Sequence, residues 1–216
     1  MKFLQSFGPN PRRVRMYMLE KNVQVPSVEL DILGGENRGE AYKKKNPSGQ
    51  LPALELDDGF VLAETVSICR YLEELHPNPP LIGTTAKERA ETDMWIRRVE
   101  LDVTGYMLDA FRYSEGLKLF ENRVRCLPEA AAGMKEKGRD GLKWLDGLLA
   151  GKTWLAGNRF TLADILLYCD LDFLGSVGQP YDTGLKNIDA WFKRAAARPS
   201  AAASLHAASA QTGMRG

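Results

Sequence analysis

Two short segments of the sequence carry residue types that suit the binding of a small peptide. The first is Asn46-Pro47-Ser48-Gly49-Gln50-Leu51-Pro52, where a proline follows an apolar residue at the start of a predicted strand. A cis bond before Pro52 would turn the N–H and C=O of Leu51 outward, where an extended peptide can pair with them. The alternative is an edge-strand proline that only prevents pairing with other chains.

The second segment is Glu64-Thr65, at the predicted start of the next helix. A hydroxyl beside the free N–H groups and positive dipole end of a helix forms an anion site. A carboxylate one residue earlier can accept an ammonium group, so the pair suits both charges of an α-amino acid. The alternative is that Thr65 only caps the helix and Glu64 favours its dipole.

The composition argues against several other chemistries. The formal net charge of +1 gives no overall attraction to nucleic acid or to an acidic membrane. His76 and His206 lie far apart, so we expect neither a zinc site nor a histidine-based triad, and no metal cofactor. No apolar run reaches the length of a membrane span, and the N-terminus lacks a signal-peptide core. Three scattered cysteines suit a reducing compartment, which predicts a cytoplasmic protein.

The first third of the chain, which must position both segments, has a mixed α/β pattern. Strands are predicted at 2–5, 27–32, 51–56 and 60–63, the last two joined by a turn at Asp58-Gly59. One helix is expected to run to about Lys21, with Asn10 as its cap and Pro11 as its first residue. A second runs from Thr65 to Leu75, and a short helix is possible between 35 and 46. This order of elements is the thioredoxin-like arrangement.

The remainder of the chain has the pattern of an all-helical domain. The boundaries expected are a thioredoxin-like domain at 1–76, a proline-rich linker at 77–85 and an all-α domain at 86–216. Helices are predicted at 86–111, 128–149, 161–177 and 188–198, and the tail after Pro199 is expected to fray. Thr161 and Asp164 form a capping box variant. The four tryptophans are expected to be core or interface anchors: Trp95, Trp144, Trp154 and Trp191.

Taken in order, these segments resemble the glutathione transferase family over nearly the whole chain. The stretches that carry the resemblance are Gly8–Arg15, Asn46–Leu54, Leu62–Leu72 and Phe160–Asp164. The last of these matches the folding-box motif of the helical domain. The resemblance implies a cytosolic detoxification enzyme of bacterial type that works as a homodimer. Its partners would be glutathione, as co-substrate, and a hydrophobic electrophile.

The resemblance also implies roles for single residues. The backbone of Leu51, before Pro52, would pair with the cysteinyl unit of glutathione, and Gln50 would reach toward its carboxylate end. Glu64 and Thr65 would bind the γ-glutamyl group. Arg38 is a candidate for the glycine carboxylate, with a solvated charged face as the alternative.

One feature of the family is missing from this sequence. Members usually place a tyrosine, serine or cysteine just before helix 1, where it interacts with the glutathione sulfur, but the stretch here reads Gly8-Pro9-Asn10-Pro11. Lowering a thiol pKa from about 8.5 to about 6.5 requires roughly 2.7 kcal/mol. A helix N-terminus supplies about 0.3–2 kcal/mol and one hydrogen bond to a charged group about 1.5–3. We therefore predict Asn10, or Ser6 if the loop curls back, as the donor; the alternative is that Asn10 only caps the helix.

The electrophile would bind between the domains, against the long helix after Ala86. The residues predicted to line this site are partly aromatic and recur at helical spacing: Tyr106, Met107, Phe111, Arg112 and Tyr113. Such a stripe is also typical of a helix core. For Arg12 and Arg13, in the first turn of helix 1, two interpretations stand: added positive potential near the thiolate, or ion pairs with acidic residues of the helical domain.

The functional prediction is a transferase whose bound thiolate attacks an electrophilic carbon. A non-catalytic glutathione-binding or interaction protein on the same scaffold is the alternative from another class. A glutathione-dependent isomerase or dehalogenase would use the same thiolate.

Overall fold

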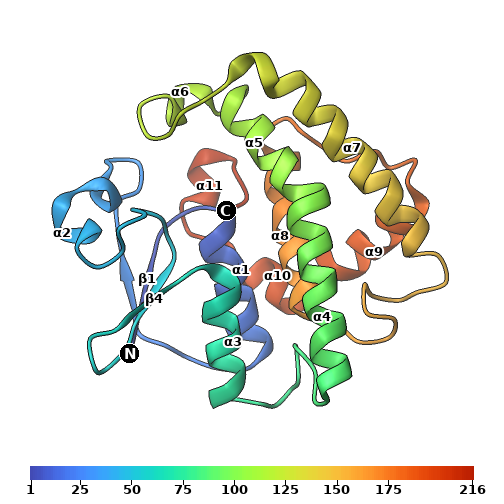
Figure 1. Cartoon of the computed structure of the whole chain (residues 1–216), viewed down its shortest axis with the longest axis horizontal. Helices are drawn as coiled ribbons and strands as arrows, with labels where there is room; N and C mark the ends of the chain where they lie inside the picture. The colour runs from blue at the N-terminus through green and yellow to red at the C-terminus, as the bar shows by residue number, and fades with distance from the viewer. The chain divides into compact units, whose positions relative to one another are not determined.

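The computed structural model describes all 216 residues, which form two compact units (Figure 1). The first unit contains Met1–Leu81 together with Pro199–Gly216, and the helical unit contains Ile82–Arg198. Residues 199–216, which the sequence pattern grouped with the helical domain, thus belong to the first unit.

The first unit is built on a four-stranded mixed sheet with the strand order β2-β1-β3-β4. The strands are β1 (Lys2–Gln5), β2 (Ser27–Glu29), β3 (Ala53–Glu55) and β4 (Val61–Ala63). β1 runs parallel to β2 and antiparallel to β3, and β3 and β4 form the predicted hairpin. The thioredoxin-like arrangement is confirmed.

Helices cover both faces of this sheet. They are α1 (Pro9–Glu20), the 3-10 turn η1 (Glu36–Arg38), α2 (Glu40–Lys43) and α3 (Thr65–Leu75). α1 and α3 pack against each other, and α2 lies on the other side of the strands (Figure 1).

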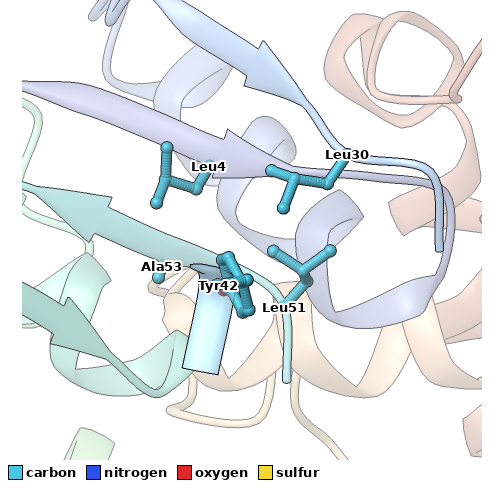
Figure 2. Close-up of a cluster of buried hydrophobic side chains, with 5 residues drawn as sticks. All are labelled: Leu4, Leu30, Tyr42, Leu51 and Ala53. Atoms are coloured by element: carbon cyan, nitrogen blue, oxygen red, sulfur yellow. The ribbon is translucent and has the colours of Figure 1, made fainter. Parts of the chain in front are cut away.

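The side chains of the central strands alternate between the two faces. Leu4 and Ala53, which are paired across β1 and β3, belong to a buried cluster with Leu30, Tyr42 and Leu51 (Figure 2). The neighbouring pair, Phe3 and Leu54, points to the opposite face because strand side chains have a period of two. The α2 helix therefore contributes its one buried side chain, Tyr42, to the core beneath Leu51.

Two local predictions for the first unit were wrong. The strand predicted at 27–32 ends at Glu29, and Val28 is 43% exposed because β2 is the edge strand. Helix α1 begins at Pro9, and its cap residue is Gly8 with φ 134°, a conformation that favours glycine. Asn10 is therefore the second residue of the helix and does not cap it.

The helical unit consists of helices, of which the one at Leu162–Ser176 is almost entirely buried. Its elements are α4 (Ala86–Arg98), the π-helix η2 (Val99–Thr104), α5 (Gly105–Tyr113), α6 (Leu117–Phe120), η3 (Pro128–Ala130), α7 (Ala131–Leu148), α8 (Leu162–Ser176) and α9 (Lys186–Ala196). The helix predicted at 86–111 thus contains a π segment. Gly141 of α7 lies so close to this segment that a Cβ there would overlap the Asp102 carbonyl oxygen.

Three of the four tryptophans are buried, and the role of Trp144 as an interface anchor stays a prediction. Trp95, Trp154 and Trp191 are 3%, 8% and 1% exposed. Trp144 is 43% exposed and lies beside the Arg98 guanidinium, 5.7 Å from its ring centroid, so it is not a core residue of the helical unit.

The capping box predicted at Thr161 and Asp164 is confirmed at the start of α8. The fully buried Asp164 carboxylate accepts hydrogen bonds from the N–H and the hydroxyl of Thr161 (2.9 and 3.1 Å). It also accepts from the Leu155 N–H at 3.0 Å and from the Trp191 Nε1–H at 2.9 Å. One side chain thus joins the start of α8 to the preceding loop and to α9.

We expect Asp164→Ala to lower the free energy of unfolding by at least about 3 kcal/mol, because it leaves several buried donors without an acceptor. Urea denaturation followed by circular dichroism measures the change. Asp140→Ala, at an exposed position on α7, is the control and should change stability by less than about 0.5 kcal/mol. Equal stability of the two variants would contradict this role.

The C-terminal segment is ordered rather than frayed. It forms α10 (Pro199–Ala203) and α11 (Ser209–Thr212), and α10 packs against α1. Arg12, which is fully buried, donates hydrogen bonds to the Ala201 and Arg215 carbonyls (both 3.0 Å) and to Ser204 Oγ (3.3 Å). The sequence pattern did not indicate these hydrogen bonds, because their acceptors are mostly backbone atoms that lie far from Arg12 along the chain.

We expect Arg12→Met to release the C-terminal segment, because methionine retains much of the packing volume but supplies no donors. Hydrogen exchange read by mass spectrometry should show faster exchange over 200–216. Arg70→Met, at an exposed position on α3 of the same unit, is the control. Unchanged exchange over 200–216 in Arg12→Met would refute the assignment.

Candidate active site

The register of the sheet brings three segments to one end of it. β1 ends at Gln5, shortly before α1 begins, and Leu4 is paired with Ala53. β3 begins at Ala53, which is paired with Ala63, the last residue of β4. Leu51-Pro52, Glu64-Thr65 and the start of α1 therefore lie at the same end of the sheet.

The peptide bond between Leu51 and Pro52 is cis, as predicted. Leu51 is buried, whereas Gln50 is exposed. Neither the N–H nor the C=O of Leu51 forms a hydrogen bond within the chain. An extended ligand could add to the sheet at this point by pairing with both groups.

The start of α3 has the features of an anion site. Its cap residue is Glu64, with no capping side chain, so Thr65 is the first helical residue and does not cap the helix. The N–H groups of residues 65–67 are without acceptors, because the first hydrogen bond runs from the Ile68 N–H to the Glu64 carbonyl (2.9 Å).

The backbone of Glu64 has φ 68° and ψ 123°. A positive φ at a residue other than glycine costs about 1–3 kcal/mol and is often found at functional sites. The Glu64 side chain is exposed and belongs to the residue directly before Thr65, the first residue of α3. A carboxylate and a row of N–H donors thus lie within one turn of each other.

The start of α1 offers few hydrogen-bond donors. Pro9 and Pro11 have no N–H, and Gly216 lies against Gly8: a side chain at 216 would place its first carbon 2.7 Å from the Gly8 nitrogen. Asn10, which is partly exposed, retains both its backbone N–H and its side-chain amide without acceptors.

The Ser6 hydroxyl is bonded to another part of the chain. The side chain is 3% exposed, and its hydroxyl donates to the Leu30 carbonyl at 2.5 Å. Since a hydroxyl has a single proton, Ser6 has no second one to donate.

Arg38 lies beside the loop that leads to Leu51. Its Nη1 donates to the Ser48 carbonyl at 3.4 Å, and its side chain runs past Gly49, which has φ 62°. Sequence reasoning missed two further residues here: Tyr42 and Asn46 both donate to the Gln50 carbonyl. Asn46 was quoted only as part of a motif, and Tyr42 had no sequence signal beyond its place in a short helix.

The residues predicted to contact the electrophile fall into two groups. Met107 and Phe111 are 5% and 6% exposed, and Phe111 packs edge-on against Phe173 within the core of the helical unit. These two therefore fit the alternative interpretation, that of a helix core.

The other three residues of that set are partly exposed. Lys137 Nζ lies 4.2 Å from the centre of the Tyr106 ring, and Arg112 pairs with Asp109 at 2.7 Å. Burial, followed by the charge of Asp109, raises the pKa of Tyr113. The Tyr113 hydroxyl is therefore a protonated donor at neutral pH.

The structure contains no cluster of three or more His, Cys, Asp or Glu side chains arranged to hold a metal ion. None of its helices combines the length and the apolar character that crossing a membrane requires. None of the three cysteines forms a disulfide bond.

Comparison with known proteins decides the family. Residues 7–75 match the model of the glutathione S-transferase N-terminal domain, and residues 128–199 match that of the C-terminal domain. The chain belongs to the glutathione S-transferase family. Glutathione S-transferase 2 of Saccharomyces cerevisiae is 32% identical over 200 residues, which cover 89% of this chain and 84% of the yeast protein.

Solved structures of family members agree. The crystal structure of Gtt2 from Saccharomyces cerevisiae matches 95% of this chain over its own full length, with 30% identity and a TM-score of 0.87. A glutathione S-transferase domain-containing protein from Marinobacter aquaeolei VT8 matches over 93% of this chain and all of its own, with 35% identity and a TM-score of 0.87. The thioredoxin-like and all-helical fold predicted from the resemblance is therefore that of the family.

We expect Glu64→Gly to leave the free energy of unfolding unchanged or to raise it by up to about 2.5 kcal/mol. Relief of about 1–3 kcal/mol of backbone strain outweighs the added entropy of the unfolded chain, about 0.4–1 kcal/mol. Thermal and urea unfolding measure the change. Glu74→Gly, inside α3, is the control and should destabilise by about 1 kcal/mol. A Glu64→Gly variant as unstable as the control would show that the residue is not strained.

Proposed function

We propose that the chain is a glutathione transferase that binds glutathione across the end of the sheet and activates its thiol at the start of α1. The observation that carries the proposal is the register of β1, β3 and β4. Through that register, the open N–H and C=O of Leu51, Glu64 with the unbonded N–H groups at the start of α3, and the start of α1 all lie at one end of the sheet.

Each part of glutathione has a complementary group at this site. The N–H and C=O of Leu51, before the cis Pro52, pair with the cysteinyl backbone. The γ-glutamyl ammonium is held by Glu64, and its carboxylate by Thr65 and the α3 amides. Gln50 and Arg38 are the proposed partners of the glycine carboxylate, and Arg38 already contacts the same loop through the Ser48 carbonyl.

Asn10 is the proposed donor to the thiolate. Its amide and N–H are without acceptors, whereas the Ser6 proton is bound to Leu30, so the geometry favours Asn10 of the two predicted donors. One hydrogen bond of about 1.5–3 kcal/mol together with the helix dipole supplies the roughly 2.7 kcal/mol that a pKa near 6.5 requires.

The reaction follows from this thiolate. The sulfur lone pair forms a bond to an electrophilic carbon, and the leaving group departs with its bonding pair. At an activated double bond the π pair instead shifts onto the activating group, and a proton from solvent completes the adduct. Tyr106, Arg112 and Tyr113 are the partly exposed residues proposed to contact the electrophile. A homodimer, a cytoplasmic location and a role in detoxification are further parts of the proposal and rest on the family resemblance.

Ultraviolet titration of glutathione bound to the purified protein tests the proposal. Thiolate absorbance should titrate with a pKa well below about 8.5. In Asn10→Ala the pKa of the bound thiol should rise by about one to two units, with turnover lower by a factor of 10 to 100 at neutral pH.

Two variants serve as controls. Ser6→Ala should leave the thiol pKa unchanged, because its hydroxyl is bound to Leu30. Glu64→Gly should weaken glutathione binding at least tenfold without unfolding the protein. Binding of glutathione with an unshifted thiol pKa would instead favour the non-catalytic binding protein, and an unchanged pKa in Asn10→Ala would remove Asn10 from the mechanism.

A further inference from the structure

The carbonyl of Gln50, whose carbon is bonded to the nitrogen of Leu51, accepts hydrogen bonds from two side chains. The Tyr42 hydroxyl donates to it at 2.7 Å, and the Asn46 Nδ2 donates at 2.9 Å. Both residues are 5% exposed, so solvent competes little with either bond. The loop arrives at Leu51 with this oxygen fixed from two directions.

The preceding residues of the loop are fixed by side chains as well. Ser48 Oγ accepts from the Gln50 N–H at 3.2 Å and donates to Asn46 Oδ1 at 2.9 Å. Asn37 Nδ2, which is buried, donates to the Gly49 carbonyl at 2.6 Å. The backbone N–H and C=O groups of Gly49 and Gln50 thus all have hydrogen-bond partners, whereas those of Leu51 have none.

Fixing the Gln50 carbonyl also fixes the Leu51 N–H. The two groups belong to one planar peptide unit and point in opposite directions across it. A rotation of that unit would move both together and would break the bonds to Tyr42 and Asn46. The direction of the Leu51 N–H is therefore set by side chains that never approach it.

Tyr42 connects this peptide unit to the core. Its ring lies in the buried cluster with Leu51 and Ala53 (Figure 2). Its hydroxyl donates to the Gln50 oxygen. Burial raises the pKa of Tyr42, which the Asn46 hydrogen bond lowers in part. The hydroxyl thus remains a protonated donor over the working pH range.

We propose that Tyr42 and Asn46 are positioning residues for glutathione: by holding the Gln50 carbonyl, they aim the Leu51 N–H at the cysteinyl unit of the ligand. The inference rests on the proposed function, since glutathione is the ligand. Neither side chain touches the reacting atoms, so their effect falls on binding and not on the chemical step.

The test compares two tyrosine-to-phenylalanine variants of the same unit. Tyr42→Phe keeps the ring and removes one donor. Tyr17→Phe is the matched control, because Tyr17 is also fully buried and its hydroxyl donates to Glu73, between α1 and α3. Both variants lose one buried hydrogen bond, and only the first loses it at the site.

Calorimetry, steady-state kinetics and thermal melting are applied to both variants. Tyr42→Phe should raise the Kd and KM for glutathione three- to tenfold and change kcat less than twofold. Tyr17→Phe should lower the melting temperature and leave both constants within twofold of wild type. Asn46→Ala is measured alone and combined with Tyr42→Phe, and the double variant should weaken binding by more than the product of the two single effects, because either donor alone still holds the carbonyl in part.

The outcomes separate the inference from the proposed function. If the wild-type protein fails to bind glutathione, the proposed function is wrong. Hydrogen exchange over 46–51 then tests whether Tyr42 holds the loop. Faster exchange in Tyr42→Phe than in Tyr17→Phe supports the inference, and equal exchange overturns it. A wild-type protein that binds glutathione, with Tyr42→Phe binding it equally well or Tyr17→Phe weakening it as much, overturns the inference while leaving the proposed function standing.

Discussion

The planar peptide unit between Gln50 and Leu51 is the constraint on which the site depends. Its carbonyl accepts hydrogen bonds from Tyr42 and Asn46, and its N–H is left without an acceptor just before the start of β3. Side-chain donors, and not a neighbouring strand, thus decide which backbone groups remain open to a ligand. Leu51 and Tyr42 also belong to one small buried cluster, which packs the side chains on either side of this peptide unit together (Figure 2).

The other two parts of the site use helix starts, and each is made in an unusual way. At α3 the cap position is a glutamate in a strained conformation, which leaves the amides of the first turn without a capping side chain. At α1 two prolines remove donors, so that Asn10 supplies most of those that remain. Both helix starts thus lack stabilising interactions that a helix start usually has, as is common where a protein leaves polar groups free to bind a ligand.

The rest of the molecule holds these elements in place through buried polar groups that reach far along the chain. Arg12 fastens the C-terminal segment to α1, and Asp164 joins the start of α8 to its loop and to α9. Each is satisfied by several partners, which is the condition under which a buried charge does not destabilise a fold. In the helical unit, glycine at position 141 permits the close approach of α7 to the π segment.

The sequence by itself determined the elements whose signals are local. The proline after Leu51, the turn at Asp58-Gly59 and the box at Thr161 and Asp164 each act within a few residues, and all lie where they were predicted. Tertiary structure decided the rest. The Tyr42 hydroxyl donates to the Gln50 carbonyl, Arg12 bonds the C-terminal segment to α1, and the Ser6 hydroxyl donates to the Leu30 carbonyl. Each of these bonds depends on an acceptor that is distant in sequence or belongs to the backbone. Neither kind of acceptor leaves a periodic pattern in the sequence, so only the folded chain reveals it.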